Sequence, residues 1–292
     1  DGKLKALYIM GENPFLSDPD QHHVAKALGN IEFMVVQDIF LTETAEFADV
    51  VLPASSFAEK EGHFTNTERR VQRLNIALPA PGEAKDDWEI TQLIANTMGS
   101  DWNYRTVKEI TEEINLTTPS YAGITWDRIG LNGLQWPCPT TEHPGTPYLH
   151  KDKFARGLGL FHEIEFKEPA ELPDEEYPLI LTTGRILEQF HTGTMSRKSK
   201  GLNNIGKPSV MISVFDAEKL GISNSEPVEV STRRGSIEIP AFVTKKMRAG
   251  TIYVPFHFVE APANRLTINA VDPVAKIPEY KVCAAKITKL KK

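Results

Sequence analysis

Short apolar runs alternate with helix-compatible segments over the first fifty residues. The candidate elements are strand, helix, strand, helix and strand, at residues 4–10, 20–28, 33–36, 43–47 and 49–52. Gly11 ends the first strand, and Gly29-Asn30 is a typical helix stop. This alternation is typical of a doubly wound α/β domain with a parallel sheet. The sequence therefore predicts such a domain over residues 1–80.

Strands dominate the last third of the chain. Candidate strands lie at residues 179–182, 210–213, 228–232, 236–243 and 251–254, with one short helix at 214–220. Arg233-Arg234-Gly235 is expected to form a hairpin turn. Closely spaced strands with one short helix are typical of a closed β-barrel, which we predict for residues 173–292. Residues 81–172 between the domains are predicted to be an irregular connector with amphipathic helices at 87–98 and 107–114.

Composition excludes several classes of function. The net charge of −6 argues against a nucleic-acid partner. No apolar segment approaches the roughly 20 residues that cross a bilayer, so we expect no membrane insertion and a cytoplasmic location. Cys138 and Cys283 lie in no Cys-x-x-Cys pair, so neither a disulfide framework nor an iron–sulfur cluster can be built within this chain, and both are expected to be buried.

Polar residues follow the first two candidate strands. Gly11-Glu12-Asn13 follows one and Asp38 the next, and ligands of parallel sheets lie beyond the carboxyl ends of strands. The carboxylate of Asp38 can accept hydrogen bonds from a guanine edge or from ribose hydroxyls, but it can equally cap the following turn. Gly11 to Asn13 can likewise be an ordinary turn. A Gly-x-Gly-x-x-Gly motif and a P-loop are both lacking, so a standard NAD or ATP site is not predicted.

Polar residues also follow the candidate strand that ends at residue 182. They offer many hydrogen-bond donors, from Thr183, Gly184, Arg185, Gln189, His191 and Thr192. Arginine suits phosphate oxygens, and glycine lets backbone amides approach a ligand closely. The alternative is a satisfied polar loop between strands. His257, between two phenylalanines, is expected to be a core histidine with one satisfied nitrogen.

Several of these segments together resemble the molybdopterin oxidoreductases, and among them the catalytic subunits of formate dehydrogenases. The resemblance rests on segments that occur in the family's order, namely Gly11-Glu12-Asn13-Pro14, Gln37-Asp38-Ile39-Phe40, residues 48–53, Gly184-Arg185-Ile186-Leu187 with His191-Thr192-Gly193-Thr194-Met195, and Pro278-Glu279-Tyr280-Lys281. The resemblance covers nearly all of this chain, but in a typical family member it covers only about the C-terminal half. It implies that the barrel is a double-psi barrel that binds a molybdopterin dinucleotide.

The resemblance also implies a cofactor and a division of labour. The family binds two molybdopterin guanine dinucleotides around molybdenum or tungsten, and its formate-oxidising members pass two electrons to an iron–sulfur cluster. We expect the metal ligand and a [4Fe-4S] cluster in the missing N-terminal half, which would be this chain's partner, and electron-transfer subunits are further candidate partners. This chain would then hold the cofactor, contain no catalytic or metal-ligating residue, and be inactive alone. By resemblance Asn264, Asn269, Tyr280 and Lys281 also line the site.

The connector would pack on the missing half, so apolar side chains around Trp126, Leu134 and Trp136 are expected to be exposed. Residues 61–70 resemble the family's Glu-Gly-x-x-x-Asn-x-Glu segment, with a solvated loop held by ion pairs as the alternative. His63 in that segment has no partners at metal-ligand spacing.

One position departs from the resemblance. Gln189-Phe190 stands where many formate-dehydrogenase-type relatives carry His-Trp, which keeps hydrogen-bonding capacity but removes a titratable group. Two alternatives stay open: the equivalent half of another family member such as a nitrate reductase, and a non-catalytic subunit that stores or delivers the cofactor.

Overall fold

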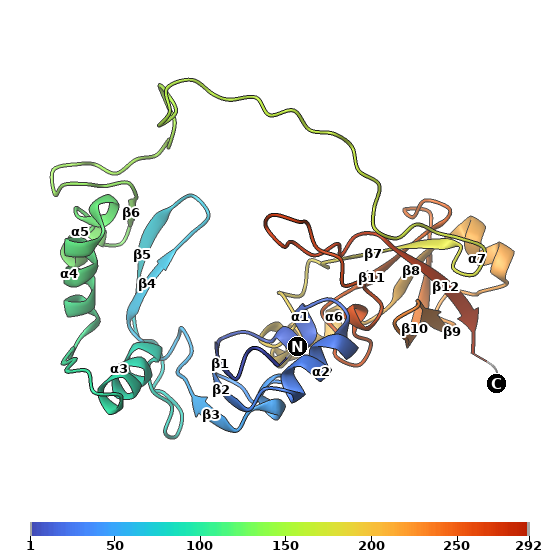
Figure 1. Ribbon diagram of the computed structural model, residues 1–292, viewed down its shortest axis with the longest axis horizontal. Helices are drawn as coiled ribbons and strands as arrows, with labels where there is room; N and C mark the ends of the chain where they lie inside the picture. Colours follow the sequence, from blue (N-terminus) through green and yellow to red (C-terminus); the bar gives the residue numbers. More distant parts are fainter. Residues whose placement is uncertain (1, 291–292) are drawn as a thin grey trace. The chain divides into compact units, whose positions relative to one another are not determined.

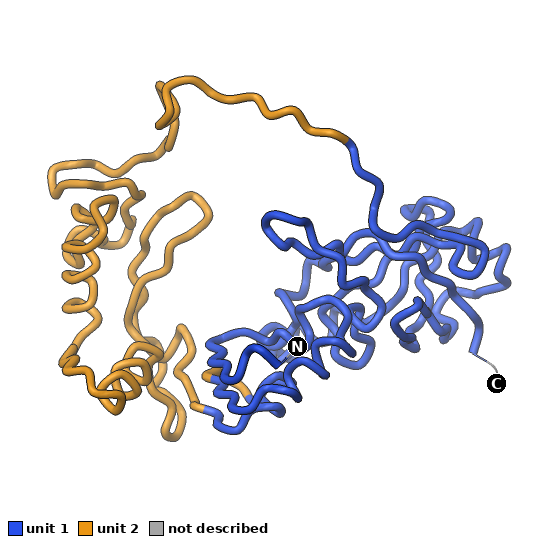
Figure 2. Tube along the Cα trace, viewed as in Figure 1, with its two compact units in different colours: residues 1–36, 41–51, 166–292 blue, residues 37–40, 52–165 orange. Residues whose placement is uncertain are grey.

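The computed structural model describes residues 2–290, and the chain forms two compact units. Unit 1 contains the residues up to 36, residues 41–51 and the residues from 166 onward, whereas unit 2 contains residues 37–40 and 52–165 (Figure 2). The predicted domain boundaries near residues 80 and 172 stay predictions. The first predicted domain begins with Asp1, and the last ends with Lys291 and Lys292. These three residues lie outside the described residues.

The N-terminal region is an α/β fold, as predicted. Its elements are β1 (Ala6–Met10), α1 (Pro14–Ser17), α2 (Gln21–Gly29), β2 (Phe33–Asp38), the 3₁₀ turn η1 (Ala45–Phe47) and β3 (Val50–Pro53). The sheet has the strand order β1-β2-β3 (Figure 1). Asp20 begins α2 by accepting a hydrogen bond from His23 N. The core contains Ile9, Val24, Leu28, Met34, Val36 and Ala45, all buried. The expected helix at residues 43–47 is only the turn η1.

A closed barrel forms the largest core of unit 1. Its strands are β7 (Leu179–Gly184), β8 (Val210–Ser213), β9 (Pro227–Ser231), β10 (Ser236–Thr244), β11 (Thr251–Pro255) and β12 (Cys283–Lys289). They pair in the order β10-β8-β11-β7-β12-β9, and β10 closes the barrel against β9. The shorter elements are η3 (Ser196–Lys198), α6 (Lys200–Ile205), α7 (Val214–Leu220) and η4 (Ala263–Arg265). The predicted barrel and helix are therefore confirmed, but β12 was not predicted.

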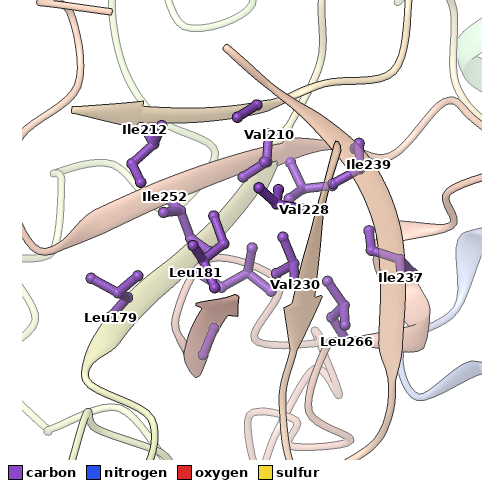
Figure 3. Packing of buried hydrophobic residues seen from close by; sticks show 14 of the residues in the cluster. Leu179, Leu181, Val210, Ile212, Val228, Val230, Ile237, Ile239, Ile252 and Leu266 are labelled. Carbon is purple, nitrogen blue, oxygen red and sulfur yellow. The ribbon is translucent and has the colours of Figure 1, made fainter. Parts of the chain in front are cut away.

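The barrel interior is filled by apolar side chains from all of its strands. Leu181, Val230 and Ile252 point toward one another inside it (Figure 3), and each is completely buried. The small residues Cys283 and Ala285 of β12 belong to the same cluster. At the predicted hairpin turn, Thr232 N donates to Gly235 O at 2.9 Å.

Unit 2 contains a small sheet and helices. The sheet has the order β4 (Gly62–Thr65), β5 (Arg70–Leu74), β6 (Leu134–Gln135), and the helices are α3 (Asp87–Thr97), α4 (Val107–Thr117), η2 (Pro119–Tyr121) and α5 (Trp126–Ile129). Residues 61–70 are thus mostly a β-hairpin, not a loop, although the expected local ion pairs form: Arg70 with Glu68 and Arg73 with Glu61, both at 2.8 Å.

The apolar side chains of unit 2 differ from expectation in their exposure. Trp126 is buried, and Leu134 and Trp136 are half-buried against a core that contains Val71 and Ile129. The expectation that they are exposed is wrong, because the unpredicted sheet covers them. Exposed apolar side chains occur instead at Leu158, Phe161 and Ile164, with 86%, 102% and 89% of their surface accessible.

Other findings concern the cysteines, membrane spans and metal sites. Cys138 and Cys283 are free and buried, as expected. Within residues 2–290, helices that are both long and apolar enough to cross a bilayer are absent. The same residues contain no group of three His, Cys, Asp or Glu side chains that could hold a metal ion.

Candidate cofactor-binding site

Three segments that are distant in the sequence meet at the carboxyl end of β7. This strand lies between β11, which is parallel to it, and β12, which is antiparallel. The register pairs Gly184 with Pro255. Thr183 Oγ1 donates to the Tyr280 carbonyl at 2.8 Å, and Lys281 Nζ donates to the Thr183 carbonyl. The barrel topology therefore brings together the predicted site residues of the loop after β7 and those that precede β12.

The backbone that leaves β7 is held by residues of β11 and the segment after it. Phe256 N donates to the Gly184 carbonyl at 3.2 Å, and Tyr253 Oη donates to the Arg185 carbonyl at 2.6 Å. A Cβ atom at position 184 would lie 2.8 Å from the Tyr253 ring, so any larger residue there would have to displace that ring. These bonds leave the Arg185 side chain exposed, with its guanidinium carbon 5.6 Å from the centroid of Phe256.

His257 joins the two ends of the loop. Its Nε2 accepts a hydrogen bond from Ile186 N at 3.0 Å, and its Nδ1 bonds the His191 carbonyl. The residue is completely buried, and this burial lowers the pKa of its imidazole. The sequence prediction of a core histidine is confirmed, but both nitrogens are bonded rather than one.

Within the loop, buried and exposed candidates differ in their partners. Gln189 is buried, with Nε2 donating to the Leu202 carbonyl at 3.1 Å and Oε1 accepting from Ser196 Oγ at 2.7 Å. His191 is exposed and has a left-handed backbone with φ 46°. Thr192 is half-buried and shares a 2.9 Å hydrogen bond with Thr194.

The turn after β1 reaches the same loop. Gly11, with φ 63°, and Glu12 are exposed, whereas Asn13 is only 6% exposed. Asn13 Oδ1 accepts from Thr44 Oγ1 at 2.7 Å, and Asn13 Nδ2 lies 3.4 Å from Thr194 Oγ1. The structure therefore brings this predicted segment to the loop after β7.

The other predicted site residues of unit 1 are likewise either bonded within the protein or exposed. Asn264 is buried and donates to the carbonyls of Leu16 at 2.8 Å and Ser17 at 2.9 Å. Tyr280 Oη also donates to the Ser17 carbonyl, at 2.9 Å, and burial together with the charge of Asp18 raises the pKa of Tyr280 to about 12. The side chains of Asn269 and Lys281 are exposed.

Asp38 belongs to unit 2. Its carboxylate accepts a hydrogen bond from Phe40 N at 3.0 Å, so it caps the following turn, as the alternative interpretation predicted. In the same unit, His63 Nε2 is buried with no hydrogen-bond partner, its ring centroid lies 4.9 Å from that of Trp126, and burial lowers its pKa.

Comparison with known proteins identifies both domains. Residues 1–97 match the family described as Molybdopterin oxidoreductase, and residues 179–284 match the Molydopterin dinucleotide binding domain. The chain belongs to the molybdopterin oxidoreductase family.

Curated members of the family are similar along nearly the whole chain. The alpha subunits of F420-dependent formate dehydrogenases from Methanococcus maripaludis and Methanocaldococcus jannaschii are each 52% identical to it, over 99% and 98% of the chain. The assimilatory nitrate reductase catalytic subunit of Bacillus subtilis is 38% identical over 98%. The matches cover 44%, 43% and 42% of these proteins, so the chain spans less than half the length of these relatives.

A solved structure supports the fold. Acetylene hydratase from Pelobacter acetylenicus aligns over 98% of this chain and 44% of its own, with a TM-score of 0.72 at 21% sequence identity. For a molybdopterin oxidoreductase, the loop after β7 is then a candidate cofactor surface because it belongs to the matched dinucleotide-binding domain and keeps the cationic side chain of Arg185 exposed.

The sequence did not predict that Tyr253 supports this loop, and it predicted His257 as a core histidine without this role. Each supports this loop through a bond to a residue at least sixty positions away in the sequence. The pairing of β11 with β7 would have been needed to find them, and that pairing is not visible in the local sequence.

Proposed function

We propose that this chain holds the molybdopterin guanine dinucleotides of a formate dehydrogenase that oxidises formate to CO2 with the release of two electrons. The observation that carries the proposal is the difference in identity between relatives. The formate dehydrogenase alpha subunits share 52% of aligned residues with this chain, whereas the nitrate reductase shares 38%. A nitrate-reductase-type activity is therefore the second candidate.

The residues at the end of β7 fit a dinucleotide cofactor. Phosphate groups need cations and amide donors, and guanine and pterin edges need groups that both donate and accept. Arg185 and Lys281 supply exposed positive charge there, and Asn269, elsewhere in the same matched domain, supplies an exposed amide. A negative charge also lies near the predicted site residues, because the carboxylate of Asp18 raises the pKa of the Tyr280 hydroxyl.

We assign the predicted site residues to two roles. Those with exposed or half-buried side chains, or with accessible backbone at a turn, would contact the cofactor: Gly11, Glu12, Arg185, His191, Thr192, Asn269 and Lys281. Those that are buried, together with the half-buried Tyr280 whose hydroxyl donates to the Ser17 carbonyl, would position the contacts: Asn13, Thr183, Gly184, Gln189 and Asn264. Asp38, which belongs to unit 2, stays a proposed cofactor contact.

When bound, the molybdenum or tungsten and its pterins supply the two-electron chemistry. The chain's own residues bind the phosphates, orient the rings and keep the loop backbone fixed. The metal ligand and a [4Fe-4S] cluster would come from the rest of the enzyme, which would be this chain's partner. We therefore predict that this chain alone does not oxidise formate.

Calorimetric titration with GDP, with ADP as the control, tests cofactor holding. GDP copies the guanine half of the cofactor, so we expect GDP to bind at least tenfold more tightly than ADP because a guanine-reading site leaves buried groups unpaired with adenine. Binding of neither nucleotide, even after the rest of the enzyme is added, would contradict the proposal.

An activity measurement separates formate from nitrate chemistry. The chain would be assembled with the rest of the enzyme, and the turnover of each substrate measured with an artificial electron carrier. Formate oxidation without nitrate reduction is expected. The reverse result would favour the nitrate-reductase candidate, and cofactor binding without either turnover would favour a cofactor-storing subunit.

A further inference from the structure

His257 has hydrogen-bond partners that define its protonation state. The His191 partner is a carbonyl oxygen, which can only accept, so Nδ1 must carry a proton. The Ile186 partner is a backbone N–H, which can only donate, so Nε2 must be unprotonated. The imidazole that satisfies both contacts is therefore the neutral Nδ1–H tautomer.

The two partners are the ends of one loop. Ile186 is two residues beyond β7, and His191 follows five residues later in a left-handed conformation that costs free energy for a non-glycine residue. Gly193 then passes close to the same residue, since a Cβ atom there would lie 2.6 Å from the His257 carbonyl oxygen. The loop therefore folds over His257, whose ring bonds both of its ends.

We propose that neutral His257 is a positioning residue that fixes the loop of residues 185–193 for cofactor binding, and that protonation of His257 releases this loop. The inference rests on the proposed function of the loop. Protonation places a second N–H at Nε2, directly opposite the Ile186 N–H donor, so that bond must break. The exposed side chains of Arg185 and His191 then lose their fixed separation.

The surroundings of His257 favour its neutral form. Burial lowers its pKa most, and the nearby charges of Arg185 and His191 lower it further, while the bond to the His191 carbonyl opposes them. The flanking rings of Phe256 and Phe258 carry no charge. Arg197 lies over Phe258, with its guanidinium paired to Glu260 at 2.7 Å.

The sign of the pH dependence follows from the lowered pKa. The folded pKa lies below the ordinary value of 6.5, so the ordered loop is fully present above pH 6.5. Its order is lost progressively as the pH falls toward and through the folded pKa.

Two variants test the proposal in the full 292-residue chain. His257→Gln keeps one acceptor and one donor but cannot gain a proton near neutral pH, whereas His257→Leu keeps the bulk and removes both bonds. The readouts are GDP affinity by calorimetry between pH 5 and 8 and amide hydrogen exchange of residues 186–193. Each variant is compared with the wild type at the same pH, which cancels the titration of the GDP phosphates.

At pH 7.5 we expect His257→Leu to bind GDP roughly tenfold more weakly and to exchange its loop amides faster. His257→Gln should match the wild type at that pH, and should lack the additional weakening that the wild type shows below pH 6.5. Equal GDP affinity and loop exchange in folded His257→Leu would overturn the proposal. So would identical pH profiles for His257→Gln and the wild type, a comparison that decides the matter if His257→Leu does not fold.

A failure of the proposed function would look different. In that case the wild type itself would bind no GDP, and loop exchange would still report whether His257 orders the loop. Faster loop exchange in His257→Leu without nucleotide binding would keep the positioning role and reject the nucleotide as the loop's ligand.

Discussion

The turn after β1 and the loop after β7 both place glycine and polar side chains at the end of a strand, but their polar atoms have different partners. In the turn, the Asn13 side chain is buried and bonds Glu43, Thr44 and Thr194. In the loop, side chains from elsewhere bond the backbone, and the Arg185 side chain stays exposed. A polar residue at a strand end can therefore connect segments within the protein or stay exposed to solvent.

The two regions differ in which of their polar atoms have hydrogen-bond partners within the protein. The buried amide of Asn13 connects three segments and has little capacity left for a ligand. In the loop after β7, Tyr253 and His257 bond the backbone, and the side chain of Arg185 stays exposed although that of Gln189 is buried and bonded. We expect substitutions in the turn to change stability most, and substitutions of exposed loop side chains to change ligand binding most.

The largest expected effect on stability is that of Asn13→Ala. The substitution leaves Thr44 Oγ1 and Glu43 without their buried partner, so we expect the free energy of unfolding to fall by about 3 kcal/mol. Urea denaturation followed by circular dichroism measures this change. Glu12→Ala is the matched control, because Glu12 is exposed and its loss should cost at most about 0.5 kcal/mol. Equal effects of the two substitutions would remove the distinction drawn for the turn.

The two glycines at these strand ends give the next comparison. Gly184→Ala forces a methyl group against the Tyr253 ring, which is 2.8 Å away, and should destabilise by about 2 kcal/mol. Gly11→Ala meets no atom within 4 Å, so only its φ of 63° is unfavourable and about 1 kcal/mol is expected. Thermal denaturation of both variants measures the difference.

A second substitution identifies the cause of the Gly184 effect. If the clash with the ring is responsible, Gly184→Ala should add little to the destabilisation already caused by Tyr253→Ala. Fully additive effects in the double variant would show that the ring is not the obstacle.

Much of the fold could be predicted because apolar periodicity is local. The strands that were predicted are rich in valine, isoleucine and leucine, as in Val228 to Val230 and Ile237 to Ile239. The strand β12 was missed because it opens with Cys283, Ala284 and Ala285, whose small side chains give no strand signal although they are buried in the barrel. The hairpin of β4 and β5 was missed because its residues are mostly polar.

The candidate site could be predicted by residue type but not by role. Asn264 and Asn269 are both amides in the same Pro-rich stretch, yet one is buried against the carbonyls of Leu16 and Ser17 and the other is exposed. Which atoms remain available for a ligand depends on contacts with residues far away in the sequence. Such contacts follow from the packing of the barrel against the α/β region, which no local pattern encodes.

Tyr280→Phe should have a smaller effect and a distinct pH dependence. Loss of the hydrogen bond to the Ser17 carbonyl should cost about 1 kcal/mol at neutral pH. The folded pKa of about 12 lies above the ordinary value of 10.0, so the wild type should lose stability as the pH rises from 10 toward 12. The variant has no hydroxyl to ionise and should lose less over that range. Denaturation curves at pH 8 and pH 11 measure this, and an equal loss in both proteins would assign the alkaline instability to other groups.

Arg185→Gln should have the smallest effect on stability of these substitutions, but it should weaken the binding of GDP. Its side chain is exposed, with the guanidinium carbon 5.6 Å from the centroid of the Phe256 ring, so the free energy of unfolding should change by at most about 0.5 kcal/mol. If Arg185 contacts a phosphate as proposed, loss of its positive charge should nevertheless weaken GDP binding roughly tenfold. Arg105→Gln, at an exposed arginine of unit 2, removes the same charge and should leave GDP affinity unchanged. Equal weakening by both variants would mean that net charge, rather than the loop after β7, governs the binding of the nucleotide.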